Sequence, residues 1–214
     1  TDPKANACGN IHAYAIKDIA TIGAWRWNDG RRFAPHNEYS SVRNAWDYAK
    51  RMNWDSFPSN IQSLEFKNDA DLKDRGEKTV VKVVFHMRLN NGGIYDSMWT
   101  YDQATNTYLR KVGGKKDIDQ ETNTQVTAKN VVIQKVNMSG AADGTSRVVI
   151  PTVSEGEAVI LQDGKIINGR WKKTSKNDRT KFYDNSGKAI KFNRGRIWIV
   201  ALPQAIGKFD IIEQ

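Results

Sequence analysis

Four polar residues in this sequence have side chains suited to ligand binding or proton transfer. Arg32, His36 and Asn37 surround Pro35 in one short segment, and Asp117 follows much later in the chain. An imidazole titrates near neutral pH, so His36 is the natural general acid or base, and Asp117 is the second candidate for a catalytic role. Arg32 can bind a carboxylate or a phosphate bidentately, while Asn37 can orient a carbonyl or the imidazole.

Pro35 predicts that this segment is a stiff loop. The proline ring fixes its own φ angle and pushes Ala34 into an extended conformation. Binding residues concentrate on loops that a rigid scaffold holds in place. The alternative is a structural turn in which His36 and Asn37 bond to backbone groups, as polar loop residues commonly do. The sequence favours this alternative, because polar loop residues often satisfy buried backbone groups. No residue pattern matches a catalytic motif with a known mechanism either.

A second candidate group comes from neighbouring predicted strands. Trp99, Tyr101, Tyr108 and Arg110 would form a stacking surface for sugar rings or bases if their side chains shared one exposed face. The competing interpretation places Trp99 in the core and the tyrosines at its rim, and it is the stronger of the two. The predicted ligand-binding residues are therefore Arg32, His36, Asn37, Trp99, Tyr101 and Arg110.

Metal and cofactor chemistry is not indicated by the sequence. The three histidines, His12, His36 and His86, lack the spacing of a ligand set, and the single cysteine, Cys8, excludes an internal disulfide and a cysteine-based metal site. The pair Gly113-Gly114 lacks the spacing and the following helix of a phosphate-binding loop. We expect no metal and no cofactor.

The composition favours anionic partners. The chain has 214 residues, of which 39% are hydrophobic and 27% charged, and no apolar run approaches the length of a membrane span. A net charge of +9 and a pI of about 9.6 suit nucleic acid, an anionic envelope polymer or lipid headgroups. The alternative, a charge that only keeps the surface solvated, is favoured because lysine and arginine are spread along the chain.

Helical patterns are confined to the first part of the chain. Ile16, Ile19 and Gly23 predict a helix over residues 11–23 that ends at the glycine. Alternating polar and aromatic residues over 24–33 predict a short hairpin with its turn at residues 28–30. A second helix is expected to start at Ser40 or Ser41 and to run to about residue 52, with Trp46 packed in the core.

From Thr79 onward the sequence predicts strands. About nine alternating or apolar runs are separated by turn signals such as Asn90-Asn91-Gly92-Gly93 and Asp163-Gly164. Regular strand spacing of this kind predicts an antiparallel barrel or sandwich. We therefore expect an α+β fold with a helical or mixed portion, 1–66, that is the tail of a larger α/β domain, followed by a β-rich domain, 67–214.

Short motifs follow one another in a fixed order over roughly residues 24–203. They are Arg32-x-x-Pro35-His36-Asn37, Trp99-x-Tyr101-Asp102, Tyr108-x-Arg110, Asp117, Asn130-Val131-Val132-Ile133, Gly156-x-Ala158, Asp163-Gly164, Gly169-x-Trp171-Lys172, Asp184-x-x-Gly187 and Gly195-x-x-Trp198-Ile199. The ordered set resembles the YerB-like bacterial lipoproteins, a family of unknown function.

The resemblance implies a two-part extracytoplasmic protein of the bacterial cell envelope, often anchored by a lipid. It also implies an α/β first domain before the Pro-His-Asn segment, with Cys8 standing where a glycine is usual. We expect contact with a membrane only through a lipid anchor that is absent from this chain. The family supplies no established activity.

Three functions compete on these grounds. The first is a non-enzymatic envelope protein that binds an anionic envelope polymer or another envelope protein, and the charge, the β-rich pattern and the resemblance favour it. The second is a cell-wall hydrolase or transferase in which Arg32 binds an anionic group, His36 is the acid or base, and Asn37 and Asp117 orient them. The third, a nucleic-acid-binding protein, ranks last because no nucleic-acid motif is visible.

Overall fold

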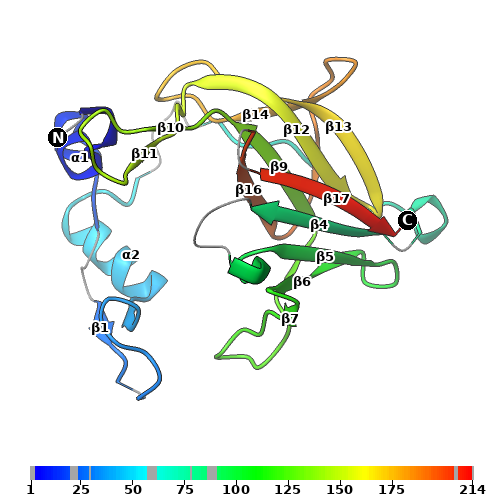
Figure 1. Cartoon of the computed structure of the whole chain (residues 1–214), viewed down its shortest axis with the longest axis horizontal. Helices are drawn as coiled ribbons and strands as arrows, with labels where there is room; N and C mark the ends of the chain where they lie inside the picture. Colours follow the sequence, from blue (N-terminus) through cyan, green and yellow to red (C-terminus); the bar gives the residue numbers. More distant parts are fainter. Residues whose placement is uncertain are drawn as a thin grey trace. The chain divides into compact units, whose positions relative to one another are not determined.

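The computed structural model describes residues 3–19, 24–28, 30–56, 62–77, 79–85, 91–204 and 207–213 (Figure 1). The chain divides into two units. The first consists of Thr1–Ile61 and Ala141–Arg147, and the second of Gln62–Gly140 and Val148–Gln214. The expected division into domains 1–66 and 67–214 stays a prediction.

The first helix of the first unit, α1 (Ala7–Ala13), starts earlier and ends sooner than the sequence predicted. A short 3-10 helix (Pro3–Ala5) precedes α1. The side chain of Asn6 caps the start of α1 by accepting a hydrogen bond from the backbone N–H of Gly9. Ala15 has a φ angle of 51°, so the chain leaves the helical conformation there. The predicted helix over 11–23 is therefore wrong from residue 14 to 19, and residues 20–23 lie outside the described ranges.

The second helix, α2 (Val42–Arg51), confirms the start predicted at Ser41. The Ser41 hydroxyl accepts a hydrogen bond from the backbone N–H of Asn44 at 3.1 Å, which satisfies one of the free donors at the helix start. The expected core position of Trp46 is wrong, because 45% of this residue is exposed. The apolar face of α2 has no buried hydrophobic residue beside it among the described residues of this unit.

Two short strands complete the first unit. β1 (Trp25–Arg26) pairs with β2 (Glu38–Tyr39) in antiparallel fashion, with Trp25 opposite Tyr39. The predicted hairpin over 24–33 is thus too short, since the chain returns to pair only at residue 38. Residues 27–37 between the strands, without Asp29, form the described loop that holds Arg32, His36 and Asn37.

The second unit contains a six-stranded antiparallel sheet. Along it the strands run in the order β17-β4-β5-β6-β7, and β8 pairs with β6. Its members are β4 (Val80–Phe85), β5 (Ser97–Asp102), β6 (Thr107–Val112), β7 (Lys115–Lys116), β8 (Thr127–Ala128) and β17 (Gly207–Glu213). The strand predicted from Thr79 is confirmed as far as Phe85, and residues 86–90, including His86, lie outside the described ranges.

A five-stranded sheet forms the other half of this unit, in the order β14-β13-β12-β9-β16. Its members are β9 (Asn130–Val136), β12 (Ser154–Gln162), β13 (Lys165–Lys173), β14 (Lys181–Asp184) and β16 (Ile197–Pro203). The last strand, β16, runs parallel to β9, which corrects the expectation of a purely antiparallel fold. Short pairs link β3 (Phe66–Lys67) to β15 (Phe192–Asn193) and β10 (Ser139–Gly140) to β11 (Val148–Val149). Two 3-10 turns (Leu72–Asp74 and Asn91–Gly93) lie in the connections.

The two sheets pack through a shared hydrophobic core. Trp99, Val81 and Tyr108 of the six-stranded sheet and Val131 and Leu161 of the five-stranded sheet belong to one buried cluster. A second cluster, which includes Trp171, Phe182 and Phe192, covers the opposite face of the five-stranded sheet. The sheets are not closed into a barrel, so the described chain is mostly β, is α+β in the broad sense, and favours the sandwich among the predicted architectures.

Candidate functional site

The segment with Arg32, His36 and Asn37 forms an ordered loop between β1 and β2. Two backbone hydrogen bonds shape it. Trp27 N–H donates to the carbonyl of Asn37 at 2.9 Å, and His36 N–H donates to the carbonyl of Phe33 at 2.8 Å. Together with the β1–β2 pairing, these bonds hold the two ends of the loop together. We call residues 24–28 and 30–39 the aromatic loop, after the rings described below.

The buried side chain of Asn37 connects the two ends of the aromatic loop by hydrogen bonds. Only 4% of Asn37 is exposed, and it is the one buried residue among the described residues of the first unit. Its Nδ2 donates to Oδ1 of Asn28 at 2.9 Å, and its Oδ1 accepts from Nη1 of Arg26 at 3.1 Å. The structural-turn interpretation expected bonds from this side chain to backbone groups, whereas its two described partners are side chains.

Arg26 is a residue that the sequence analysis overlooked. Its Nη2 forms an ion pair with Oε2 of Glu38 at 2.7 Å, and its Nη1 also reaches the carbonyl of Pro35 at 3.4 Å. Because Arg26 and Glu38 are opposite each other in the β1–β2 pair, the signal was their complementary charge. That signal is readable only once the strand register is known.

Arg32 and His36 lie on the outside of the aromatic loop. Nη1 of Arg32 donates to the hydroxyl of Tyr39 at 2.8 Å, which fixes the guanidinium beside that ring. His36 is exposed, and its imidazole makes no hydrogen bond with any described residue. The loop therefore presents a cation and an imidazole at its surface, on a frame that Asn37 and Arg26 hold.

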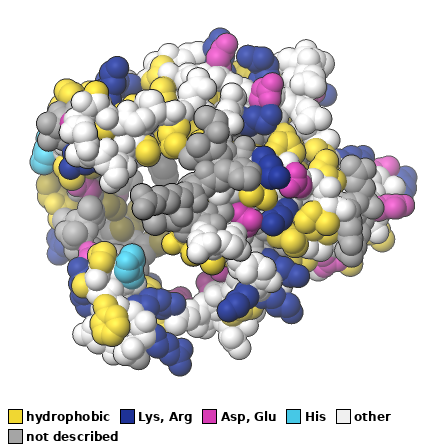
Figure 2. All heavy atoms as spheres, in the orientation of Figure 1, with side chains coloured by type: hydrophobic (Ala, Val, Ile, Leu, Met, Phe, Trp, Pro, Cys, Tyr) yellow, Lys and Arg dark blue, Asp and Glu magenta, His cyan; other side chains and the backbone are white. Residues whose placement is uncertain are grey.

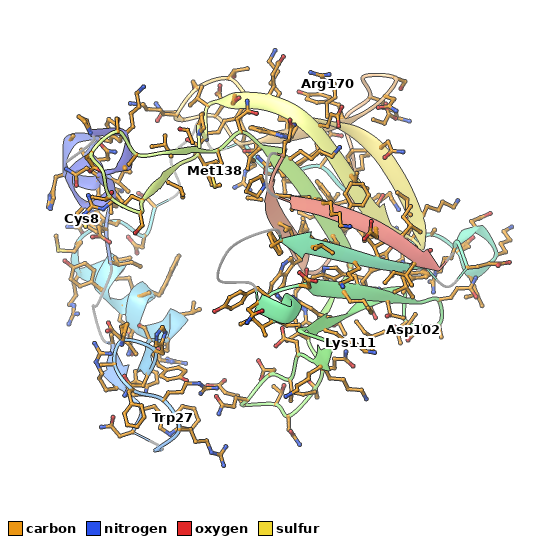
Figure 3. All side chains as sticks on the ribbon, in the orientation of Figure 1. Cys8, Trp27, Asp102, Lys111, Met138 and Arg170 are labelled. Atoms are coloured by element: carbon orange, nitrogen blue, oxygen red, sulfur yellow. The ribbon has the colours of Figure 1, made fainter. Side chains whose placement is uncertain are left out.

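Three aromatic rings gather on the same loop. Trp25 stacks on Tyr39 with ring centroids 6.5 Å apart, and Trp27 meets the edge of Tyr39 at 5.4 Å. Trp25 is 48% exposed and Trp27 is 41% exposed, so both rings keep much of their surface open to solvent (Trp27 in Figure 3). Figure 2 shows Lys and Arg side chains beside hydrophobic ones at the lower left, where β1 lies in Figure 1.

The second predicted aromatic group is buried instead. Trp99 has no exposed surface, Tyr101 is 3% exposed and Tyr108 is 1% exposed. The core position of Trp99 was expected by the alternative interpretation, but the rim position of the tyrosines is wrong. Burial raises the pKa of Tyr101 to about 12, and its hydroxyl donates to Oδ1 of Asn106 at 2.8 Å. These rings offer no open face for stacking a ligand in this structure.

Arg110 and Asp117 form an ion pair with each other. The guanidinium of Arg110 also lies over the ring of Trp198, 4.2 Å from its centroid, and that ring packs against Trp99. Within the described residues, Nε of Arg110 and Nε1 of Trp99 are buried without a hydrogen-bond partner. The described partner of Asp117 is thus Arg110, whereas the sequence suggested Arg32 or His36.

A buried polar network around Asp163 was not foreseen either. Its carboxylate accepts hydrogen bonds from Lys67 at 2.5 Å, from Asn106 at 2.8 Å and from Asn193 at 2.6 Å. Burial alone would raise the pKa of Asp163, but the bonds from Lys67, Asn106 and Asn193 outweigh it and hold the pKa below the ordinary value. The sequence identified this residue only as part of a turn, because its partners come from distant segments.

Two further sequence expectations concern metals and membranes. Over the described ranges, no group of three or more His, Cys, Asp or Glu residues is placed to hold a metal ion. Cys8 is exposed and unpaired with any other cysteine, as it must be in a chain with one cysteine. In the part of the chain that the structure describes, no helix has the length and apolar character needed to span a membrane.

Comparison with known proteins gives one family and one similar structure. The C-terminal domain of a family described as a protein of unknown function (DUF3048) matches residues 81–199. The crystal structure of the YerB protein from Bacillus subtilis has a similar fold, with a TM-score of 0.69 and 23% sequence identity. The match covers 88% of this chain and 59% of the YerB chain, so this chain spans well under two thirds of that protein. No curated protein matches this sequence.

Proposed function

Since the chain belongs to the DUF3048 family, whose function is unknown, we propose that it is a non-enzymatic binding module for an anionic polymer of the bacterial cell envelope. The observation that carries this proposal is the aromatic loop, where the exposed rings of Trp25 and Trp27 contact Tyr39, and Arg32 donates a hydrogen bond to the Tyr39 hydroxyl. The resemblance to lipoproteins and the net charge of +9 support the envelope as its place.

The chemistry of the loop suits a sugar polymer with acidic groups. Exposed indole rings stack on the apolar faces of sugar rings, and they lose little conformational entropy when they do so. A guanidinium binds phosphate or carboxylate oxygens through parallel hydrogen bonds. Trp25, Trp27 and Arg32 supply both kinds of group on one loop, so repeated units of an anionic polysaccharide are the ligand they fit.

The hydrogen bonds and the ion pair inside the aromatic loop also favour binding. Asn37, Arg26 and Glu38 bond to one another and to the loop backbone, so the rings are held in place before a ligand arrives. A binding surface that is ordered in advance loses less entropy on association. The three residues that build this frame are therefore positioning residues, and Trp25, Trp27 and Arg32 are the proposed contacts.

The direct experiment is retention on cell-wall sacculi, prepared either with their phosphate-containing polymers or after acid removal of these polymers. We expect the chain to sediment with the intact sacculi at low salt and to be released as the salt concentration rises. Trp27→Ala should weaken retention about tenfold, since an aromatic stacking contact contributes on the order of 1–3 kcal/mol. Trp46→Ala is the matched control, because Trp46 is similarly exposed in the same unit but lies outside the loop.

Three results would contradict the proposal, and the first two concern the contact itself. One is the absence of retention on intact sacculi at every salt concentration. The other is an equal loss of retention in the Trp27→Ala and Trp46→Ala variants, which would show that the loop is not the contact. Equal retention on stripped sacculi would remove the anionic polymer from the proposal and leave a protein or peptidoglycan partner.

The enzymatic alternative makes a different prediction for His36. A hydrolase or transferase that uses this imidazole loses turnover in His36→Ala, while a binding module keeps most of its retention. The exposed imidazole, which has no orienting hydrogen bond within the described chain, favours the second outcome. Release of soluble fragments from sacculi by the wild-type chain, abolished in His36→Ala, would establish the enzyme instead.

A further inference from the structure

A pocket in the second unit provides a binding site that is separate from the aromatic loop. Its volume is about 370 Å³, at the small end of the range for small-molecule sites. It lies beside the turn after β14, the edge strand of the five-stranded sheet, where Ala189 pairs with Tyr183. Its polar lining consists of Lys67, Lys188, Lys191, Gln162 and Asp184, and Ile190 supplies apolar surface.

Lys67 is held in place by the buried network behind the pocket. Its Nζ donates to Oδ2 of Asp163 at 2.5 Å and to Oδ1 of Asn193 at 2.7 Å. The third contact, to the carbonyl of Asn68, is long at 3.4 Å. Asp163 balances the charge of Lys67, so this lysine contributes a hydrogen-bond donor at a fixed position. A ligand oxygen can replace the carbonyl of Asn68 as the third partner of Nζ.

The positive charge of the pocket comes from the two other lysines. The ammonium of Lys188 makes no hydrogen bond or ion pair with any described residue, and Lys191 is paired only with Glu65 at 3.5 Å. Both members of that pair are more than half exposed, so solvent screens the attraction between them. Oδ1 of Asp184 accepts three hydrogen bonds from Ser186 and Lys188 in its own turn, which stabilises the single carboxylate that lines the pocket.

We propose that this pocket binds a phosphate monoester on a small hydroxylated carbon skeleton, from glycerol to a monosaccharide in size. Lysine binds phosphate as a point charge, and the described lining contributes three lysines and no arginine. A phosphate monoester carries close to two negative charges at neutral pH, more than a carboxylate does, and Lys188 and Lys191 exceed the single Asp184 carboxylate of the lining by one positive charge. The apolar side of the ligand would then contact Ile190.

Isothermal titration with glycerol 3-phosphate, using the whole chain at low salt, tests the site directly. We expect saturable one-to-one binding, and about fivefold weaker binding in Lys188→Ala, because a partly exposed charge pair contributes up to about 1 kcal/mol. Lys188 is exposed and holds no structural bond through its side chain, so this variant keeps its fold. Lys116→Ala is the control, since it removes the same charge from an exposed position on β7 outside the pocket.

A carboxylate ligand is the alternative to a phosphate monoester, and the same titration distinguishes the two. Glucuronate, a sugar of similar size with a planar carboxylate, should bind more weakly than glycerol 3-phosphate, and stronger binding would replace the phosphate in the proposal. No saturable binding, or the same loss in Lys188→Ala and Lys116→Ala, would overturn the pocket as a site. The proposal is independent of the aromatic loop, because Trp27→Ala should leave this titration unchanged.

Discussion

Asp163 joins distant parts of the second unit through its buried polar network. Its partners Lys67 and Asn193 come from the paired strands β3 and β15, and Asn106 comes from the turn between β5 and β6. A buried carboxylate needs such partners, because removing a charge from water costs several kcal/mol when it stays unpaired. The three bonds also explain why Asp163 is ionised in the fold even though it is buried.

Asp163→Asn should lower the free energy of unfolding by about 2–3 kcal/mol at pH 7, because it leaves Lys67 beside a neutral amide. The pKa of Asp163 is lower in the folded state, so its contribution is complete above the ordinary carboxyl pKa of about 3.9 and is lost as the pH falls through the folded value. Urea unfolding at pH 7 and pH 3 checks this, and the difference between variant and wild type should shrink at pH 3. Asp71→Asn, at an exposed position, should show neither effect.

Arg110 has a structural role in the second unit. Its guanidinium stacks on Trp198 and pairs with Asp117, so Arg110→Ala should lower the free energy of unfolding by about 2 kcal/mol. Arg170→Ala removes the same side chain from an exposed position whose pair with Glu155 is long at 3.8 Å, and it should change stability by less than about 0.5 kcal/mol (Arg170 in Figure 3). Chemical denaturation of both variants measures the difference. Equal stability of the two variants would contradict the role given to Arg110.

Residue spacing predicted which side chains share one face of a strand, but not what surrounds them. Two-residue spacing correctly places Trp99 and Tyr101 on one face of β5, but it cannot show whether that face is covered. The cover comes from Val131 and Leu161, which are distant in sequence and belong to the other sheet. The same limit hid the partners of Asp163 and the contact between Arg26 and Asn37.

At the scale of elements, turn chemistry was the most reliable signal. Asp163 and Gly164 both have positive φ angles, 51° and 70°, and connect β12 to β13 with Gln162 opposite Lys165. This is the two-residue hairpin that an Asp-Gly pair predicts. The Ser41 cap of α2 was equally readable, because both signals are local. The parallel pairing of β16 with β9 could not be read from local sequence, because it depends on which distant strand has a free edge.

The β12–β13 turn gives a sharp test of packing at an element boundary. A Cβ atom on Gly164 would come within 2.4 Å of the Tyr101 ring and 2.8 Å of the carbonyl oxygen of Gly76. Gly164→Ala should therefore cost about 3 kcal/mol or more, from backbone strain and the clash together. Gly187→Ala is the control, because Gly187 also has a positive φ angle but has open space around it, and only about 1 kcal/mol of strain is expected. Thermal unfolding should give a clearly lower midpoint for Gly164→Ala than for Gly187→Ala.

At the scale of the whole molecule, hydrophobic burial is unevenly distributed. Every buried hydrophobic residue among those described, from Val80 to Leu202, belongs to the second unit. In the first unit the large apolar side chains of Trp25, Trp46 and Phe33 are exposed. Burial of apolar surface supplies most of the free energy of folding, so the cooperative stability of the chain should come from the second unit.

A fragment that starts at residue 62 and ends at residue 214 tests this distribution. It retains both sheets and both buried clusters, so it should unfold in one cooperative transition with a midpoint within about 5 °C of that of the whole chain. Differential scanning calorimetry gives the midpoint, and near-ultraviolet circular dichroism reports the packing of Trp99 and Trp171. Residues 1–61 alone should show no cooperative transition, because their described part has no hydrophobic core. A fragment 62–214 that lacks a cooperative transition would mean that the first unit contributes directly to the stability of the two sheets.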